Sequence, residues 1–291
     1  MVTLGDDAMG KIVIERQRRC RPGDIEYLSV PLSERRVKEI GKFNVKTPSD
    51  KSNCLIRGVV YLPYKQIILS DFNNQKLKLF TDKGQYLDEL TIRGDPCDLC
   101  LVNNNTVAVA VTSPGGVRVV KVEGSKLSLS SEINMPNGKD CFGITHTDGR
   151  FIVGTDGEDV YSVTQDGATE LLYKYNYICH CLTHDPVKGD TLVSVSNIKR
   201  HTDVMKVGVV RDVTGIDVDR EGNIYVCGYS SHNVVQMSGD GTHVRELLTS
   251  SDEMEHPWAI AVRDDTFVVT SCNPWKSKSA DNNCIRVFQL F

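Results

Sequence analysis

The sequence predicts an all-β fold: a six-bladed β-propeller, closed by an N-terminal strand, with a shortened fourth blade. Three observations predict it. Short apolar strands recur with a period of about 40 residues, each unit holds several such strands, and the two ends of the chain complement each other. A period of this length with several strands per unit is typical of propellers.

The first strand of each unit is short and apolar and begins just after a polar or turn-like residue. The six starts are Arg57, Cys97, Cys141, Cys179, Val213 and Trp258. A denser β-branched run follows in each unit, as in 106–111, where apolar residues are nearly continuous. Continuous apolarity indicates burial on both faces, which a middle strand between two neighbouring blades requires. In most units a third strand follows, and a turn then leads to a more polar outer strand.

The fourth unit is shorter than the others, so 197–202 is expected to form a loop and 203–210 the one strand that follows it. Ring closure is predicted from the two ends of the repeat region. Residues 39–45 resemble an outer strand without a blade, and the chain finishes on a third strand at 285–291. Pairing these two segments removes two exposed sheet edges. We therefore divide the chain into an N-terminal extension or linker, 1–37, and a propeller, 38–291.

The composition limits the cellular compartment and the classes of binding partner that we expect. The chain has 291 residues, a net charge of −4 and ten cysteines. It contains neither a signal-peptide pattern nor an apolar run of about 18 residues, so we expect a cytoplasmic protein without membrane association. In that setting the cysteines are expected to be reduced and buried. The negative net charge argues against a uniformly basic, nucleic-acid-binding surface.

One repeat carries a family resemblance. The segment 215–235 reads Gly-Ile-Asp-Val-Asp-Arg-Glu-Gly-Asn-Ile-Tyr-Val, followed by Asn233-Val234-Val235, and it resembles an NHL repeat. The first unit, at 68–77, and the sixth, at 256–262, echo it more weakly. The chain is similar to the C-terminal NHL propeller of tripartite-motif (TRIM) ubiquitin ligases. This resemblance implies a domain that recruits substrates for ubiquitination, with catalysis in a RING that this sequence does not contain.

Candidate binding residues lie in two sets of loops, because the loops that lead into the innermost strands and those that join the second strand to the third gather on one face of a propeller. We expect partner contacts from Arg57, Arg93, Asp95, Lys139, Asp140, Arg211, His232, Trp258 and Trp275. Trp, Tyr and Arg are the residues that most often anchor partners. Two interpretations of Trp258 stay open, a contact residue or a wedge between blades.

The predicted function is protein binding, without catalysis, metal or cofactor, and without a small-molecule substrate. Neither a catalytic triad nor a phosphate-binding loop is apparent, and the cysteines lack zinc spacing. RNA binding is the alternative, supported by Lys199, Arg200 and His201 with Lys276 and Lys278. A second alternative is a calcium-dependent lactonase or esterase, for which Asp98, Asp140, Asp212 and Asp217 are available.

Overall fold

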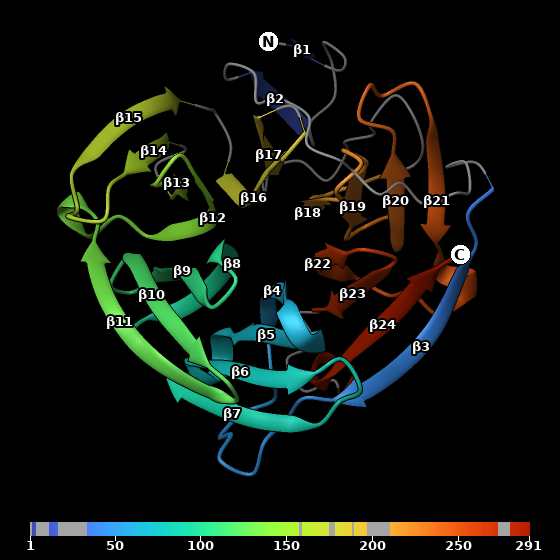
Figure 1. Cartoon of the computed structure of the whole chain (residues 1–291), viewed down its shortest axis with the longest axis horizontal. Coiled ribbons are helices and arrows are strands. Elements are labelled where there is room, and N and C mark those ends of the chain that lie inside the picture. The colour runs from blue at the N-terminus through green and yellow to red at the C-terminus, as the bar shows by residue number, and fades with distance from the viewer. Residues whose placement is uncertain are drawn as a thin grey trace.

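The computed structural model describes residues 2–3, 12–16, 34–156, 159–174, 178–187, 189–196, 210–272 and 280–291. These residues form four-stranded antiparallel sheets that stand around a central axis (Figure 1). Short 3-10 helices occupy connections between strands: η1 (Pro63–Lys65), η2 (Phe72–Asn74), η3 (Pro136–Gly138), η4 (Ser250–Asp252) and η6 (Ala280–Asn283). No helix among the described residues is long and apolar enough to cross a membrane.

Four blades are built from consecutive strands, ordered from the axis outward. The first contains β4 (Ile56–Leu62), β5 (Gln66–Asp71), β6 (Lys76–Thr81) and β7 (Tyr86–Thr91). The second contains β8 (Asp95–Asn103), β9 (Thr106–Thr112), β10 (Gly116–Glu123) and β11 (Lys126–Asn134). The third contains β12 (Cys141–Thr147), β13 (Arg150–Thr155), β14 (Asp159–Val163) and β15 (Thr169–Lys174). Another contains β18 (Val213–Val218), β19 (Ile224–Gly228), β20 (Asn233–Met237) and β21 (Val244–Leu248).

A fifth blade joins the two ends of the repeat region. It contains β22 (Pro257–Arg263), β23 (Thr266–Ser271) and β24 (Cys284–Leu290), and its outer strand is β3 (Val37–Asn44). The register pairs Val287 with Gly41 and Ile285 with Phe43. The predicted closure by an N-terminal strand is therefore confirmed. Its physical reason is that β24 would otherwise leave an unpaired edge.

The prediction of a six-bladed propeller with a shortened fourth blade is wrong, because five blades are present and the remaining sheet is assembled differently. That sheet, which we call the composite sheet, has the order β1-β2-β17-β16. Only its inner strands, β16 (Ile178–His184) and β17 (Asp190–Ser196), come from the fourth unit. Its outer strands, β2 (Ile12–Arg16) and β1 (Val2–Thr3), come from the N-terminal segment, which was expected to be an extension or linker. Residues 203–209, where a third strand was predicted, lie outside the described residues.

The hydrophobic core consists of layers between adjacent sheets. One layer joins the fifth blade to the first through Val59, Ile67 and Leu69 on one side and Ala261 and Val268 on the other. The middle strand β9 is buried along its whole length, whereas the outer strand β11 is mostly exposed. This confirms the expectation that continuous apolar runs mark strands enclosed on both faces.

Candidate binding surface at the channel mouth

Each innermost strand contains a bulge near its start, and these bulges bring the candidate site together. The register shifts at Ile56/Gly58 in β4, Cys141/Ile144 in β12, Cys179/Cys181 in β16 and Pro257/Ile260 in β22, and equivalent shifts occur in β8 and β18. A bulge adds a residue to one strand and redirects its side chain. The bulged segments supply Arg57, Phe142, His180 and Trp258.

Glycines allow the bulged strands to lie close together around the axis. A Cβ atom at Gly58 would lie 2.6 Å from the carbonyl oxygen of Cys97, and one at Gly215 would lie 2.5 Å from that of Trp258. Since real Cβ atoms do not approach backbone so closely, only glycine fits these two positions without a shift of the neighbouring strand.

An aromatic cluster surrounds the bulged residues. Trp258 is central to it: its ring lies 6.0 Å from that of His180 and 5.6 Å from that of Tyr229, both nearly edge-on. Phe142 lies 6.3 Å from His180, and the Tyr229 ring lies 4.6 Å from that of His256. Such tilted and edge-on pairs are favourable aromatic geometries.

Two histidines complete the cluster in a conformation that non-glycine residues rarely adopt. His232 has φ 55° and His256 has φ 46°, and their ring centroids are 4.4 Å apart. The backbone N–H of His256 donates a hydrogen bond to Nδ1 of His232 at 3.2 Å. Left-handed conformations of this kind cost free energy and concentrate at functional positions.

Arg57 is the cationic side chain of the cluster. Its guanidinium carbon lies 3.7 Å from the centroid of the Phe72 ring and 5.7 Å from that of Trp258, which are cation–π distances. We define the aromatic mouth as these eight half-buried residues: Arg57, Phe72, Phe142, His180, Tyr229, His232, His256 and Trp258. They come from five different sheets, so the ring closure assembles the surface.

Burial sets the protonation of the mouth. It lowers the pKa of His180 to about 4, helped by the nearby charge of Arg57, so that this imidazole is neutral at pH 7. Burial also raises the pKa of Tyr229 to about 12, which keeps its hydroxyl protonated. His180 and Tyr229 therefore add no charge beside Arg57.

Three residues of the predicted contact set, Arg57, His232 and Trp258, lie in the aromatic mouth. Trp258 also packs against the core layer between the first and fifth blades, as a wedge between blades would. Its role as a contact residue stays a prediction. Trp275 lies outside the described residues. Sequence reasoning did not select the remaining five residues of the mouth. Four of them lie in the loops that it had singled out, and Phe142 follows Cys141 just as His180 follows Cys179.

Of the other predicted contact residues that the structure describes, Asp95, Asp140 and Lys139 have local partners. Asp95 accepts a hydrogen bond from Gln75, and Asp140 accepts one from the backbone N–H of Ser113. Lys139 pairs with Asp159 at 2.6 Å and also contacts Tyr161. Arg93 and Arg211 have exposed side chains. Three of the charged residues that were expected to contact a partner are therefore engaged in bonds within the propeller.

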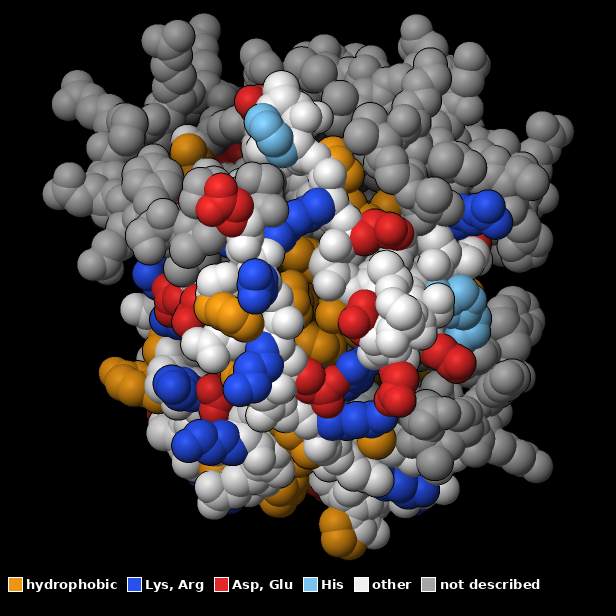
Figure 2. Space-filling view, turned by 90° about the vertical axis from the view of Figure 1, so that its right-hand side faces the viewer, with side chains coloured by type: hydrophobic (Ala, Val, Ile, Leu, Met, Phe, Trp, Pro, Cys, Tyr) orange, Lys and Arg blue, Asp and Glu red, His pale blue; other side chains and the backbone are white. Residues whose placement is uncertain are grey.

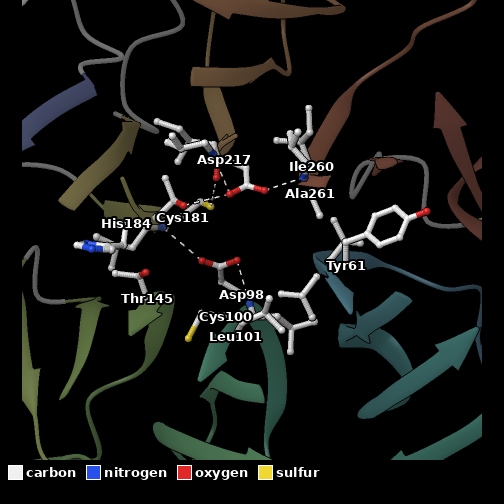
Figure 3. A pocket seen from close by; sticks show the side chains of 18 of the residues that line it. Tyr61, Asp98, Cys100, Leu101, Thr145, Cys181, His184, Asp217, Ile260 and Ala261 are labelled. Carbon is white, nitrogen blue, oxygen red and sulfur yellow. Dashed lines mark hydrogen bonds between the residues drawn. The ribbon is translucent and has the colours of Figure 1, made fainter. Parts of the chain in front are cut away.

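Beyond the mouth, the channel widens into a cavity of about 340 Å³ between the later parts of the innermost strands. Asp98 from β8 and Asp217 from β18 point into it (Figure 3). Asp98 accepts hydrogen bonds from the backbone N–H groups of Leu99, Ile144 and Leu182. Burial raises the pKa of Asp98 to about 7 and that of Asp217 to about 6.

Asp217 is engaged in the same way. It accepts hydrogen bonds from the N–H groups of Val218 and Val262 and from the hydroxyl of Thr183. Of the four carboxylates considered for calcium, these two lie in the channel and already serve as acceptors for backbone donors. Asp140 and Asp212 lie in loops, where they accept from Ser113 and Ser230. The four do not form one ligand set within the described part of the chain.

A second cluster of possible metal ligands is occupied by a lysine side chain. Among the described residues, Asp50, Cys54 and Asp71 are near enough to one another to hold an ion. The ammonium of Lys78 lies between them, 2.5 Å from Asp50, 2.7 Å from Asp71 and 3.3 Å from the sulfur of Cys54. This cluster is a buried ion pair that fastens the segment 45–55 to the first blade.

Comparisons with known proteins agree with a propeller. The SBBP β-propeller repeat matches residues 211–234, which overlap the strongest repeat of the sequence. No curated protein matches the chain. A Bacteroides thetaiotaomicron VPI-5482 protein of unknown function is structurally similar, with a TM-score of 0.68, 8% identity and coverage of 88% of this chain and 76% of that one.

Two enzymes are also structurally similar. Virginiamycin B lyase from Staphylococcus aureus gives a TM-score of 0.58 at 11% identity and covers 89% of this chain and 100% of its own. A PQQ-bound aldose sugar dehydrogenase from Streptomyces coelicolor gives 0.60 at 14% identity, with coverage of 90% and 100%. At such identities the likeness shows the fold alone. The chain is a β-propeller, and none of these comparisons points to NHL or TRIM proteins.

Proposed function

We propose that this propeller is a protein-interaction module that binds its partner through the aromatic mouth and performs no chemistry of its own. The observation that carries the proposal is the mouth itself. Six aromatic or imidazole rings, with a seventh under Arg57, are each half-buried and in contact, on loops held by a rigid ring of sheets. Binding groups usually lie on loops of this kind.

The composition of the mouth supports a protein partner. Trp, Tyr and Arg supply most of the binding energy in protein interfaces, particularly where they lie at the centre of a contact surface. Trp258, Tyr229 and Arg57 lie together here. Among the described residues of the mouth, Arg57 is the one Lys or Arg side chain, and a polyanion requires several phosphate contacts. The basic residues that supported RNA binding lie outside the described residues: Lys199, Arg200, His201, Lys276 and Lys278. On the flank shown in Figure 2, basic and acidic side chains are interspersed among the coloured residues, with no continuous basic region.

The NHL-like repeat at 215–235 extends the proposal to a biological role. By its resemblance to the C-terminal propellers of TRIM ligases, the module would hold a cytoplasmic substrate for ubiquitination by a RING, in cis or in a partner. The resemblance of the sequence motif supports this role, and the aromatic mouth would be the part that selects the substrate.

The test is a selection of binding peptides followed by affinity measurements. A random peptide library displayed on phage is selected on the immobilised full chain, and fluorescence anisotropy gives Kd for the enriched peptides. Trp258→Ala is expected to weaken binding about 30-fold or more, because central tryptophans contribute about 2 kcal/mol or more. Tyr64→Ala is the matched control, since Tyr64 is 93% exposed in η1 after β4, at the opposite end of the innermost strand.

Two results would contradict the proposal. One is equal peptide affinity for the wild-type chain and a folded Trp258→Ala variant. The other is the absence of any enriched peptide together with binding of a random RNA pool that weakens steeply between 50 and 200 mM salt, on the order of 10³-fold or more as multiple phosphate contacts predict. That second result would favour the RNA-binding alternative.

A further inference from the structure

We propose that the aromatic mouth recognises an acidic side chain of its partner, Asp or Glu within a continuous segment, and that Arg57 is the residue that receives the carboxylate. This inference rests on the proposed function, because it assigns the chemistry of the group that the partner inserts.

The first observation is the unused hydrogen-bonding capacity of Arg57. A guanidinium carries five N–H donors. One terminal nitrogen contacts the sulfur of Cys97 at 3.8 Å, and sulfur is a weak acceptor. The Nε atom is buried and has no hydrogen-bond partner. Nε itself is closed to solvent, so a partner's acceptor would meet the other terminal nitrogen, which makes no hydrogen bond to the described residues and is not buried.

The second observation is that Arg57 lacks the counter-ion that comparable cations have. Lys78, Arg35 and Lys139 are buried or half-buried, and each has a carboxylate within 4.0 Å. Among the described residues, no carboxylate lies within 4.0 Å of the Arg57 guanidinium. Acids beside the mouth have other partners. Asp71, which precedes Phe72, pairs with Lys78. Asp212, whose charge acts on His180, accepts from Ser230.

The third observation concerns the shape and charge of the site. A planar guanidinium binds a carboxylate through two parallel hydrogen bonds. The face of Arg57 is stacked on Phe72, which leaves its edge as the part that donates. His180 is neutral at pH 7, so its imidazole adds no positive charge beside Arg57. One carboxylate therefore matches the site in charge and geometry.

Two groups of aromatic rings near Arg57 favour a segment that continues past the carboxylate. The Phe72 ring lies 3.7 Å from the guanidinium carbon of Arg57, and the Trp258 ring, which contacts that of Tyr229, lies 5.7 Å from it. A chain that runs across the mouth would place apolar neighbours of the acidic residue against both groups of rings. A C-terminal carboxylate has residues on one side only and would leave one group without a contact.

The experiment combines substitutions on both sides of the contact. For the tightest selected peptide, Kd is measured with the wild-type chain and with Arg57→Gln, using the peptide and its Glu→Gln or Asp→Asn version. Charge-assisted hydrogen bonds predict a loss of about ten- to hundredfold for either substitution alone. The second substitution should add little once the first is made, as for two groups in direct contact. Arg220→Gln is the control, since Arg220 is 68% exposed and pairs with Asp264 outside the mouth.

The outcomes separate this inference from the proposed function. If Trp258→Ala abolishes binding but the acid-to-amide peptides bind as tightly as their parents, the mouth binds protein and the carboxylate assignment is overturned. Loss of binding on amidation of the peptide C-terminus, with no effect of internal amide substitutions, would also overturn it. The peptide substitutions need no change in the protein, so the inference is tested even if Arg57→Gln fails to fold.

Discussion

Asp98 makes the stability of this propeller fall as pH rises, and the effect can be isolated with one substitution. Its carboxyl group is 6% exposed and lies within the channel, where burial raises its pKa from 3.8 to about 7. An acid whose pKa is raised by folding binds its proton more tightly in the folded state. Its stabilising contribution is therefore complete below pH 3.8 and is lost as pH rises through about 7.

The magnitude follows from these two pKa values. By linkage, the contribution of Asp98 to the unfolding free energy falls by about 2.5 kcal/mol between pH 5 and pH 8, and most of this fall occurs between pH 5 and pH 7. Asp98→Asn removes the titration while keeping the size of the side chain. The difference in unfolding free energy between the wild-type chain and this variant should shrink by about 2.5 kcal/mol from pH 5 to pH 8. Other titrating groups contribute equally to both proteins and cancel.

Urea unfolding at pH 5, 6, 7 and 8 measures this difference directly. Asp148→Asn serves as the control, because Asp148 is exposed, and its unfolding free energy should follow the wild-type value at every pH. A wild-type-minus-Asp98→Asn difference that stays constant within about 0.5 kcal/mol across this range would refute the assignment of a raised pKa.

Two further predictions concern parts of the fold outside the channel. Lys78→Met leaves Asp71 buried without its cation and Asp50 with Lys76 alone, and it should lower the unfolding free energy by about 3–5 kcal/mol in urea titrations. Lys126→Met, at an ion pair whose lysine is 75% exposed, should cost about 1 kcal/mol or less, and similar losses for both variants would contradict the cluster's role. Removal of residues 1–33 uncovers the edge of β17 and should lower the thermal midpoint and promote self-association, measured by sedimentation. An equally stable, monomeric truncated chain would contradict the pairing of β2 with β17.

The regular part of the fold could be predicted because its signals are local. Continuous apolar runs such as 106–111 identify strands enclosed between sheets, and β9 is buried along its whole length. Closure by β3 could be predicted because both ends of the repeat region left an unpaired edge. The composite sheet could not be predicted. Its β2–β17 pairing joins segments far apart in the chain, and a five-residue strand has no distinctive pattern.

The candidate site was predicted in position but not in chemistry. The loops that supply Tyr229, His256 and Phe72 were identified from the repeat, yet the selected contact residues were mainly charged. Sequence order cannot show that Asp140 accepts from Ser113 or that a bulge turns His180 beside Trp258. Bulges depend on register, and register is set by pairing across the sheet.

The channel carboxyls explain how a sheet assembled from distant segments can hold its place in the ring. Asp98 reaches across the channel from β8 of the second blade to the N–H of Leu182 in β16, and Asp217 reaches from the adjacent strand β18 to the hydroxyl of Thr183 in the same strand. Both bonds lie two or three residues beyond His180, the contribution of β16 to the aromatic mouth. The innermost strand of the composite sheet is thus held within the channel by carboxyl groups from two other blades. Because these bonds fix β16 directly, His180 can keep its position beside Trp258 although the outer strands of that sheet come from the far N-terminus.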